Sequence, residues 1–310
     1  MTVSAEKKPL NVAVLLPCYN EALTVVDTIR QMRAVLPDAR IIVFDNNSKD
    51  GSGDLARKEG VEVRLVRAQG KGNVVRRMFA DIQADVYLML DADTTYAPET
   101  APALIAAIAS GEADMACGVR KGAADAFPSG HQLGNRLFNL IVSSLFGRGM
   151  QDIFSGYRAF SPRFVRSFPA HSAGFEIETE LSVFTLEQRI PFVEIPSPYG
   201  VRPEGSFSKL KTYRDGFRIL FTIALLYKEL RPMMFFGLIS LFLAAVSLWL
   251  GIPVIIDWVH TGLVERLPTA ILSSAIGVLA TLLFVAGMVL NGVARAYRET
   301  RHLCYLNVRP

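Results

Sequence analysis

Four stretches decide the fold: NVAVLLPCYNE at residues 11–21, RIIVFDNNSKDGS at 40–52, VEVRLVRAQGKGN at 61–73 and VYLMLDAD at 86–93. Each begins with a short, apolar, β-branched run that is typical of a buried strand and ends in polar residues. Helical stretches separate these runs, and a fifth apolar run follows the last helix at 115–119. The expected helices lie at residues 22–35, 51–59, 73–82 and 98–110, and a later one is expected at 132–146. Strands that alternate with helices predict βαβ units, and therefore an α/β fold with a mostly parallel sheet.

The composition limits the kinds of protein that this chain can be. Its 310 residues are 51% apolar and carry a formal net charge of +4, which is too small to indicate a nucleic-acid partner. The apolar excess is concentrated between residues 232 and 294, where Asp257, Glu265 and Arg266 are the only charged residues. We therefore exclude a purely soluble protein, a disordered chain and a collagen-like one, and we expect no nucleic-acid partner.

Polar residues follow each of the first four apolar runs. PCYNE follows the first run, DNNSKDGS the second, QGKGN the third and DAD the fourth. In an open parallel sheet, ligands bind beyond the carboxyl ends of the strands. A solvated loop would explain any one of these stretches, but four in succession predict a binding site at one edge of the sheet.

Several common sites do not fit these motifs. A dinucleotide-binding fold needs G-x-G-x-x-G after its first strand, where this chain has PCYNE. A P-loop needs a glycine separated by four residues from Gly-Lys-Ser/Thr; Leu65 stands at that place and Gly72 follows Lys71. The four histidines show no H-E-x-x-H spacing, and the three isolated cysteines indicate neither a disulfide framework nor a zinc site.

The four polar motifs together resemble those of glycosyltransferase family 2. Two later motifs, DIFSGYR at 152–158 and RPEGSFSKL at 202–210, are similar to those of polyprenyl-phosphate glycosyltransferases, the dolichyl- or undecaprenyl-phosphate mannose and glucose synthases. The resemblance covers about residues 11–230. It implies a Rossmann-like fold of the glycosyltransferase A type, with a mostly parallel sheet that binds a nucleotide sugar.

Asp91 and Asp93 are the candidate metal ligands. They alternate at the end of a strand and therefore point to the same side. Two close carboxylates repel unless a cation lies between them, and hard oxygen ligands suit Mg²⁺ or Mn²⁺ shared with a diphosphate. Such a cation neutralises charge on a leaving nucleoside diphosphate. The alternatives are a helix-capping pair before Pro98, and a role for Asp91 in holding a sugar or ribose hydroxyl.

The resemblance implies further site residues. Residues from all four motifs and one later glutamate are expected to bind the nucleotide sugar: Pro17, Tyr19, Asn20, Glu21, Asp45, Lys71, Asp91 and Glu178. Asp93, Asp152 and Arg158 are expected to act in catalysis beside the reacting sugar. A buried structural pair is the alternative for Asp152 and Arg158. Which of Glu176 and Glu178 contacts the donor stays open.

The resemblance also implies a polyprenyl phosphate, undecaprenyl or dolichyl, as the acceptor. Its phosphate is expected to bind Arg202, Ser206, Ser208 and Lys209, although this cluster could instead form a patch for anionic membrane lipids. Because the second pKa of a phosphate is about 6, the acceptor is already nucleophilic at neutral pH and needs no general base. Direct displacement inverts the anomeric carbon. UDP-glucose is the favoured donor and GDP-mannose the alternative.

Two uncharged segments, at about 233–256 and 268–294, predict transmembrane helices. The first has about 24 residues and spans roughly 36 Å, enough for a hydrocarbon core of about 30 Å. Lys228, Arg231 and Arg295 flank the pair, so the positive-inside rule predicts a multi-pass protein of the inner membrane with both termini and the catalytic domain in the cytoplasm. We expect a catalytic domain at 1–209, an amphipathic interfacial helix at 210–231 and the membrane part at 232–310.

A stripe of small residues from Ala270 to Thr281 predicts that the second span packs against the first or against a second subunit. Two other functions compete with sugar transfer to a polyprenyl phosphate. A polysaccharide synthase with a hydroxyl acceptor would carry Q-x-x-R-W in its catalytic domain, but the only tryptophans, Trp249 and Trp258, lie at the first span. A non-catalytic membrane adaptor would not need the acidic residues that this chain retains.

Overall fold

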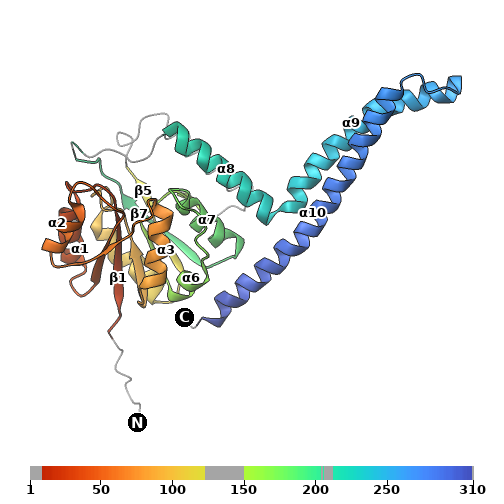
Figure 1. The fold of residues 1–310 in the computed structure, drawn as a ribbon. Helices are drawn as coiled ribbons and strands as arrows, with labels where there is room; N and C mark the ends of the chain where they lie inside the picture. The colour runs from red at the N-terminus through yellow and green to blue at the C-terminus, as the bar shows by residue number, and fades with distance from the viewer. Residues whose placement is uncertain (1–8, 123–149, 204, 206–211, 309–310) are drawn as a thin grey trace, which may run out of the picture. The chain divides into compact units, whose positions relative to one another are not determined.

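The computed structural model describes residues 9–122, 150–203, 205 and 212–308. The chain forms two compact units. The first comprises Met1–Leu220 together with Arg301–Pro310, and the second comprises Phe221–Thr300. Figure 1 draws both along the chain, from the red N-terminus to the blue C-terminus. The helix expected from the sequence between residues 132 and 146 lies outside the described residues.

A seven-stranded sheet forms the centre of the first unit. Its strand order is β3-β2-β1-β4-β6-β5-β7. The pairs β1–β2, β2–β3, β1–β4 and β5–β7 are parallel, and β6 runs antiparallel to both β4 and β5. The mostly parallel α/β fold expected from the sequence is therefore confirmed. The strands are β1 (Val12–Cys18), β2 (Arg40–Asp45), β3 (Glu62–Leu65), β4 (Val86–Met89), β5 (Met115–Lys121), β6 (Arg158–Phe160) and β7 (Phe192–Pro198).

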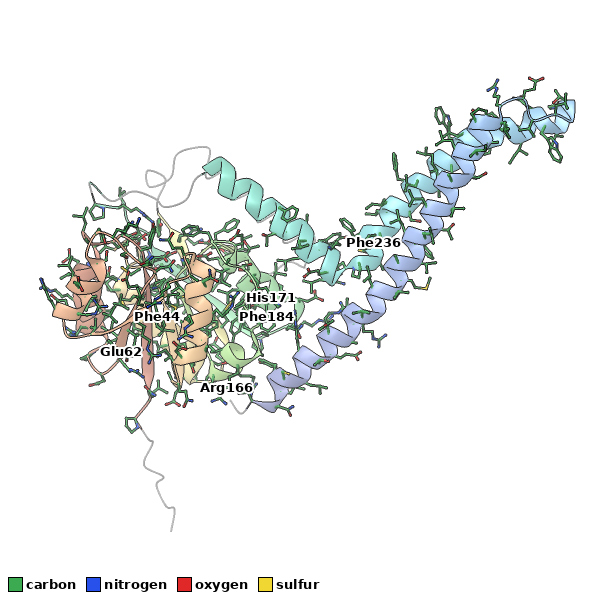
Figure 2. All side chains as sticks on the ribbon, viewed as in Figure 1. Phe44, Glu62, Arg166, His171, Phe184 and Phe236 are labelled. Carbon is green, nitrogen blue, oxygen red and sulfur yellow. The ribbon has the colours of Figure 1, made fainter. Side chains whose placement is uncertain are left out.

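Helices connect the strands and cover the sheet (Figure 1). They are α1 (Val25–Val35), α2 (Ser52–Lys58), α3 (Lys71–Asp81), the 3₁₀ helix η1 (Pro98–Thr100), α4 (Ala101–Ala109), α6 (Pro162–Ser167) and α7 (Ile177–Glu187). Helix α1 shows why they dock: its buried residues Val25, Ile29 and Met32 recur at helical spacing and face the core. Phe44 of β2 is fully buried inside the unit, and side chains fill the space around it (Figure 2).

The register of the sheet places the polar motifs at one edge. Strand β1 lies between β2 and β4, and its last residue Cys18 pairs with Asp45 at the end of β2. The Cys18 carbonyl then accepts a hydrogen bond from the Asn46 amide at 2.8 Å. The polar residues that follow the three neighbouring parallel strands β2, β1 and β4 therefore lie in one region, at the carboxyl ends of these strands.

The last residues of the chain also belong to the first unit. Tyr305 is buried, and its hydroxyl donates a hydrogen bond to Asp114. The guanidinium of Arg163 lies 5.0 Å from the centre of the Tyr305 ring and donates to the Val308 carbonyl at 3.2 Å. The carboxyl-terminal segment therefore contributes to the packing of this unit.

Among the described residues, two helices are long and apolar enough to cross a membrane. They are α9 (Pro232–Thr261) and α10 (Leu267–Asn307), and they follow α8 (Thr212–Leu230). In the most apolar 18-residue stretch of each helix, only 11% (α9) and 17% (α10) is buried, whereas the core helix of a soluble protein is mostly buried. The exposed apolar surface of the pair therefore indicates a location in a membrane.

Small residues let α9 and α10 pack side by side (Figure 1). The hydroxyl of Ser240 donates to the Ala280 carbonyl, and that of Ser247 donates to the Ser273 carbonyl, both at 2.8 Å. A Cβ atom on Gly277 would lie 2.9 Å from the Ser247 hydroxyl. The part of the small-residue stripe that contains Ser273 and Gly277 therefore packs against the first span.

We predict that Gly287→Leu destabilises this helix pair. A Cβ at Gly287 would lie 2.9 Å from Cβ of Phe236 on α9, so a larger side chain forces the helices apart, at a cost of about 1–3 kcal/mol. Gly292→Leu is the matched control, because a Cβ there meets no atom within 4 Å. The measurement is the unfolding free energy of the full chain in mixed detergent micelles. Equal losses in the two variants would contradict the predicted contact.

Candidate active site

The strand ends surround a cavity of about 320 Å³. Residues from the ends of β1 and β4, the loops after β2 and β3, and the start of α3 line it, together with two residues from later in the chain. The lining residues are Pro17, Cys18, Tyr19, Glu21, Asn46, Gln69, Gly70, Lys71, Val74, Asp91, Ala92, Asp93, Phe175 and Arg202. Seven of the residues expected from the sequence thus meet in one place: Pro17, Tyr19, Glu21, Lys71, Asp91, Asp93 and Arg202.

Lys71 joins two carboxylates at the floor of the site. Its Nζ lies 2.5 Å from Oδ1 of Asp91 and 2.6 Å from Oε1 of Glu178. Burial alone would lower the pKa of Lys71, but the two negative charges outweigh burial and raise it. Lys71 therefore stays protonated. Of the two candidate glutamates, Glu178 is the one beside Lys71, and it reaches the cavity through this lysine.

Asp93 is held on both carboxylate oxygens. Its Oδ1 accepts hydrogen bonds from the Thr95 hydroxyl at 2.5 Å and the Thr95 amide at 3.2 Å, and its Oδ2 lies 2.5 Å from Nη2 of Arg202. Burial and the nearby Asp91 charge raise the pKa of Asp93, and the Arg202 charge opposes them. Each aspartate of the DAD motif is thus paired with one cation.

The two aspartates fit a divalent cation that is shared with a ligand. Among the described residues, no group of three or more His, Cys, Asp or Glu side chains could hold a metal by itself. Mg²⁺, however, is commonly held by one or two carboxylates plus substrate phosphates. In the structure Lys71 and Arg202 neutralise Asp91 and Asp93, as a bound divalent cation would. The donor set therefore suits Mg²⁺ or Mn²⁺ bound together with a diphosphate.

Glycines 70 and 72 allow two segments of backbone to approach each other closely. A Cβ on Gly70 would lie 2.2 Å from the Ala173 carbonyl oxygen, and one on Gly72 would lie 2.0 Å from that of Ser172. The Gly72 amide donates to the Gly174 carbonyl at 3.1 Å. The close backbone approach is thus between α3 and the segment before α7, and it brings Lys71 next to Glu178.

Asn20 and Asp45 organise the loop after β2. The side-chain oxygen of Asn20 accepts a hydrogen bond from the backbone amide of Lys49 at 2.8 Å. The backbone amide of Asn20 donates to the Ser48 hydroxyl at 3.0 Å. Asp45 is buried and accepts from the Ser48 amide at 3.0 Å. Neither residue lines the cavity, so their expected contacts with the nucleotide stay predictions.

Asn46 is a site residue that the sequence did not reveal. Its side-chain nitrogen donates to the carbonyls of Val66 and Ala68, and its oxygen accepts from the Gly70 amide at 2.7 Å. Only an amide side chain can donate and accept in this way. Its position directly after the strand-end residue Asp45 could have pointed to Asn46. Its hydrogen-bond partners, however, lie about twenty residues further along the chain, so their contact cannot be read from the local sequence.

Asp152 and Arg158 do not pair with each other. Asp152 binds Arg120 through two bonds of 2.7 Å, and Arg120 lies over the Tyr199 ring. Burial would raise the pKa of Asp152, but the hydrogen bonds and charge of Arg120 outweigh it and lower the pKa. The Asp152 carboxylate is thus already bound to the Arg120 guanidinium, and its expected catalytic role stays a prediction.

Arg158 is completely buried and donates to the Ser155 and Ile153 carbonyls and to the Ser182 hydroxyl. Arg158 does not line the cavity, and its expected catalytic role stays a prediction. The segment that it fixes contains Gly156, where a Cβ would lie 2.7 Å from Oδ2 of Asp91. Arg158 therefore shapes the wall beside Asp91.

Of the four residues expected to bind an acceptor phosphate, Arg202 lies at the cavity. The other three, Ser206, Ser208 and Lys209, lie outside the described residues.

Comparisons with known proteins identify the family and the fold. The model of the family described as glycosyl transferase family 2 matches residues 13–168. Glycosyltransferase AglJ from Haloferax volcanii is 32% identical over 296 residues, which are 94% of this chain and 96% of that protein. Undecaprenyl-phosphate mannosyltransferase from Micrococcus luteus is 26% identical, and the match covers 63% of this chain and 86% of that protein.

A solved structure shows the same fold. It is the crystal structure of glucosyl-3-phosphoglycerate synthase from Mycobacterium tuberculosis in complex with Mn²⁺, UDP-glucose and phosphoglyceric acid. The TM-score is 0.57 at 20% identity, over 69% of this chain and 79% of that chain.

We predict that Gly72→Ala destabilises the domain. The added methyl group would collide with the Ser172 carbonyl, and because backbone is fixed on both sides the strain should cost about 1–3 kcal/mol or more. Gly200→Ala is the control, because its nearest neighbour, the Thr95 carbonyl oxygen, would lie 3.8 Å away. The measurement is the thermal unfolding midpoint of the full chain in detergent. A midpoint for Gly72→Ala equal to that of the control would contradict the role given to this glycine.

Proposed function

This chain belongs to glycosyltransferase family 2, and we propose that within the family it transfers one sugar from a nucleoside diphosphate sugar to a polyprenyl phosphate at a membrane surface. One observation carries the proposal. A cavity at the strand ends holds two aspartates suited to a divalent cation and an arginine suited to a phosphate, in a chain that also has two helices of membrane-spanning length. A nucleotide-sugar enzyme with a lipid acceptor needs all of these features.

The relatives support the two substrates separately. The Micrococcus luteus relative is named for an undecaprenyl phosphate and for mannose, which supports a polyprenyl phosphate acceptor and makes GDP-mannose a competing donor. The solved structure of the same fold contains Mn²⁺ and UDP-glucose. We expect UDP-glucose as the donor, with Pro17, Tyr19 and Glu21 beside the nucleoside.

The residues at the cavity suit a displacement that needs no protein base. An oxygen of the acceptor phosphate forms a bond to the anomeric carbon while the bond to the diphosphate breaks, so the nucleoside diphosphate leaves with the electron pair and the configuration inverts. A phosphate dianion is already a nucleophile at neutral pH. Asp91 and Asp93 are each engaged by a cation, Lys71 and Arg202, so the proposal assigns neither of them the role of a base. A polysaccharide synthase would instead have to deprotonate a hydroxyl.

Asp91 and Asp93 would hold Mg²⁺ or Mn²⁺, with the diphosphate completing the coordination. When bound, such a cation stabilises the negative charge that develops on the leaving diphosphate. The chain's own part is to orient the carboxylates: Thr95 fixes one oxygen of Asp93, and Lys71 holds Asp91.

We predict that Asp93→Asn lowers sugar transfer by about 100-fold or more, because a neutral amide stabilises the charged transition state far less. The assay uses the full chain in nanodiscs with polyprenyl phosphate, Mn²⁺ and, in turn, UDP-glucose, GDP-mannose and UDP-N-acetylglucosamine. Asp54→Asn is the control, an aspartate on the exposed face of α2 that pairs with Arg57. Full activity in excess EDTA would refute the metal role. Transfer to a sugar hydroxyl but not to the lipid would refute the acceptor.

We further propose that both chain termini face the cytoplasm, because basic residues flank the helix pair whereas the loop between α9 and α10 carries a single arginine. Cys304 is exposed and Cys18 and Cys117 are buried, so labelling is easily assigned. We predict that an impermeant maleimide labels Cys304 only from the cytoplasmic side. Leu263→Cys in a Cys304→Ser background should be labelled only from the opposite side. Labelling of both positions from one side would overturn this topology.

A further inference from the structure

Tyr96 is a buried tyrosine three residues after the DAD motif. It is 5% exposed and does not line the cavity. Its ring contacts the rings of Tyr157 and Tyr199, with 5.2 and 5.1 Å between the ring centres, and its backbone forms an isolated antiparallel bridge with Tyr199. The Gly200 amide donates to the Thr95 carbonyl at 2.8 Å on the same segment. Packing and backbone contacts therefore fix where the Tyr96 hydroxyl lies.

That hydroxyl holds the backbone of Gly156. It accepts a hydrogen bond from the Gly156 amide at 2.8 Å. A Cβ on Gly156 would lie 2.7 Å from Oδ2 of Asp91 and 3.0 Å from Nζ of Lys71, so the backbone at Gly156 forms the wall against which this ion pair packs. The Tyr96 hydroxyl thus sets the position of a wall that lies beside Asp91.

Asp91 needs such a wall more than Asp93 does. Both oxygens of Asp93 are held, Oδ1 by Thr95 and Oδ2 by Arg202, and its side chain is 3% exposed. The side chain of Asp91 is 29% exposed, and Lys71 holds it through Oδ1. Its Oδ2 is the oxygen that faces Gly156. The wall therefore limits how far the Asp91 carboxylate can rotate about its contact with Lys71.

The hydroxyl acts through geometry and not through charge. Burial raises the pKa of Tyr96 well above its usual value, so the hydroxyl stays neutral. Replacing it by hydrogen in Tyr96→Phe keeps the ring and the net charge of the site. The change removes only the acceptor for the Gly156 amide, and a buried amide without its acceptor favours a shift of the backbone.

We propose that Tyr96 is a positioning residue for Asp91, which it orients through the backbone of Gly156. Two successive residues then orient the two aspartates of the DAD motif: Thr95 binds Asp93 directly, and Tyr96 fixes the wall beside Asp91. That the oriented carboxylate serves a divalent cation and a diphosphate rests on the proposed function. The contact between Tyr96 and Gly156 does not.

The first test compares two buried tyrosines. Tyr87 on β4 is 2% exposed and lies outside the cavity lining, and its hydroxyl also accepts from a backbone amide, that of Ala84 at 3.2 Å. Mn²⁺ is titrated into the full chain in detergent at one fixed UDP concentration and followed by electron paramagnetic resonance. Tyr96→Phe should raise the Kd of Mn²⁺ by about tenfold or more, as loss of a group that orients a metal ligand does. Tyr87→Phe should stay within about twofold of the wild type.

Both variants lose a buried hydroxyl, so both should lower the thermal unfolding midpoint, and a purely structural role would not separate their Mn²⁺ affinities. Hydrogen exchange without metal or nucleotide gives an independent measurement. Tyr96→Phe should speed exchange in the peptide that contains Gly156, and Tyr87→Phe should not. Equal Mn²⁺ affinities in the two variants, or unchanged exchange at Gly156 in Tyr96→Phe, would overturn the proposal.

Gly156→Ala tests the wall without touching Tyr96, and it decides the matter if Tyr96→Phe fails to fold. The added methyl group must displace the Asp91 carboxylate, so Mn²⁺ binding should weaken by about tenfold. Gly200→Ala is the control, because its Cβ would lie 3.8 Å from the nearest atom. A folded Gly156→Ala variant that binds Mn²⁺ like this control would refute a positioning role for the wall.

The proposal and the proposed function fail in different ways. If Tyr96→Phe weakens Mn²⁺ binding but no donor gives transfer to polyprenyl phosphate, the proposed function fails and the positioning role stands. If the wild type transfers sugar but binds no Mn²⁺, the metal role fails, and loss of transfer in Tyr96→Phe but not in Tyr87→Phe still supports the positioning of Asp91. If transfer and Mn²⁺ binding are the same in both variants, the role of Tyr96 fails alone.

Discussion

The repulsion among three carboxylates, two of them buried and one half-buried, is the constraint on which the site at the end of β4 depends. Asp91, Asp93 and Glu178 converge there, and carboxylates that lose water must be protonated or meet cations. Lys71 and Arg202 meet them at distances of 2.5–2.6 Å. Each cation comes from a different part of the chain, so the site exists only when the start of α3, the start of α7 and the segment after β7 are all in place.

Close backbone contacts bring those parts together. Gly70 and Gly72 let the start of α3 touch the segment before α7, and Gly156 leaves room for Asp91 beside Lys71. Buried arginines brace the surrounding turns: Arg158 binds carbonyl groups, and Arg120 binds Asp152. Each buried charge is satisfied by several polar groups, which offsets much of its cost of desolvation. The wall of the cavity is thus held in large part by residues that do not line it: Gly72, Gly156, Arg120 and Arg158.

The local pattern of the sequence predicted the sheet and the gathering of polar residues at its edge, because alternating strands and helices leave few topologies. It also placed Asp91 and Asp93 correctly at a cavity. It could not predict that Asp152 binds Arg120, since that pair joins residues 32 positions apart through tertiary packing. The same limit hid Asn46, whose partners lie on the next loop, and the contact of Gly72 with the segment before α7. Nor could the local pattern predict that Arg158 is completely buried against the Ser155 and Ile153 carbonyls, because these contacts form only in the folded domain.

Charge balance limits what the cavity can bind. Glu21, Asp91 and Asp93 line the cavity together with Lys71 and Arg202, and Glu178 lies beside Lys71. Among these described residues the carboxylates outnumber the cations, so the site has no excess positive charge for an anionic ligand. A diphosphate that approached alone would meet these carboxylates with no cation to offset the repulsion. This is the physical reason why the proposed function includes a divalent cation at the DAD motif.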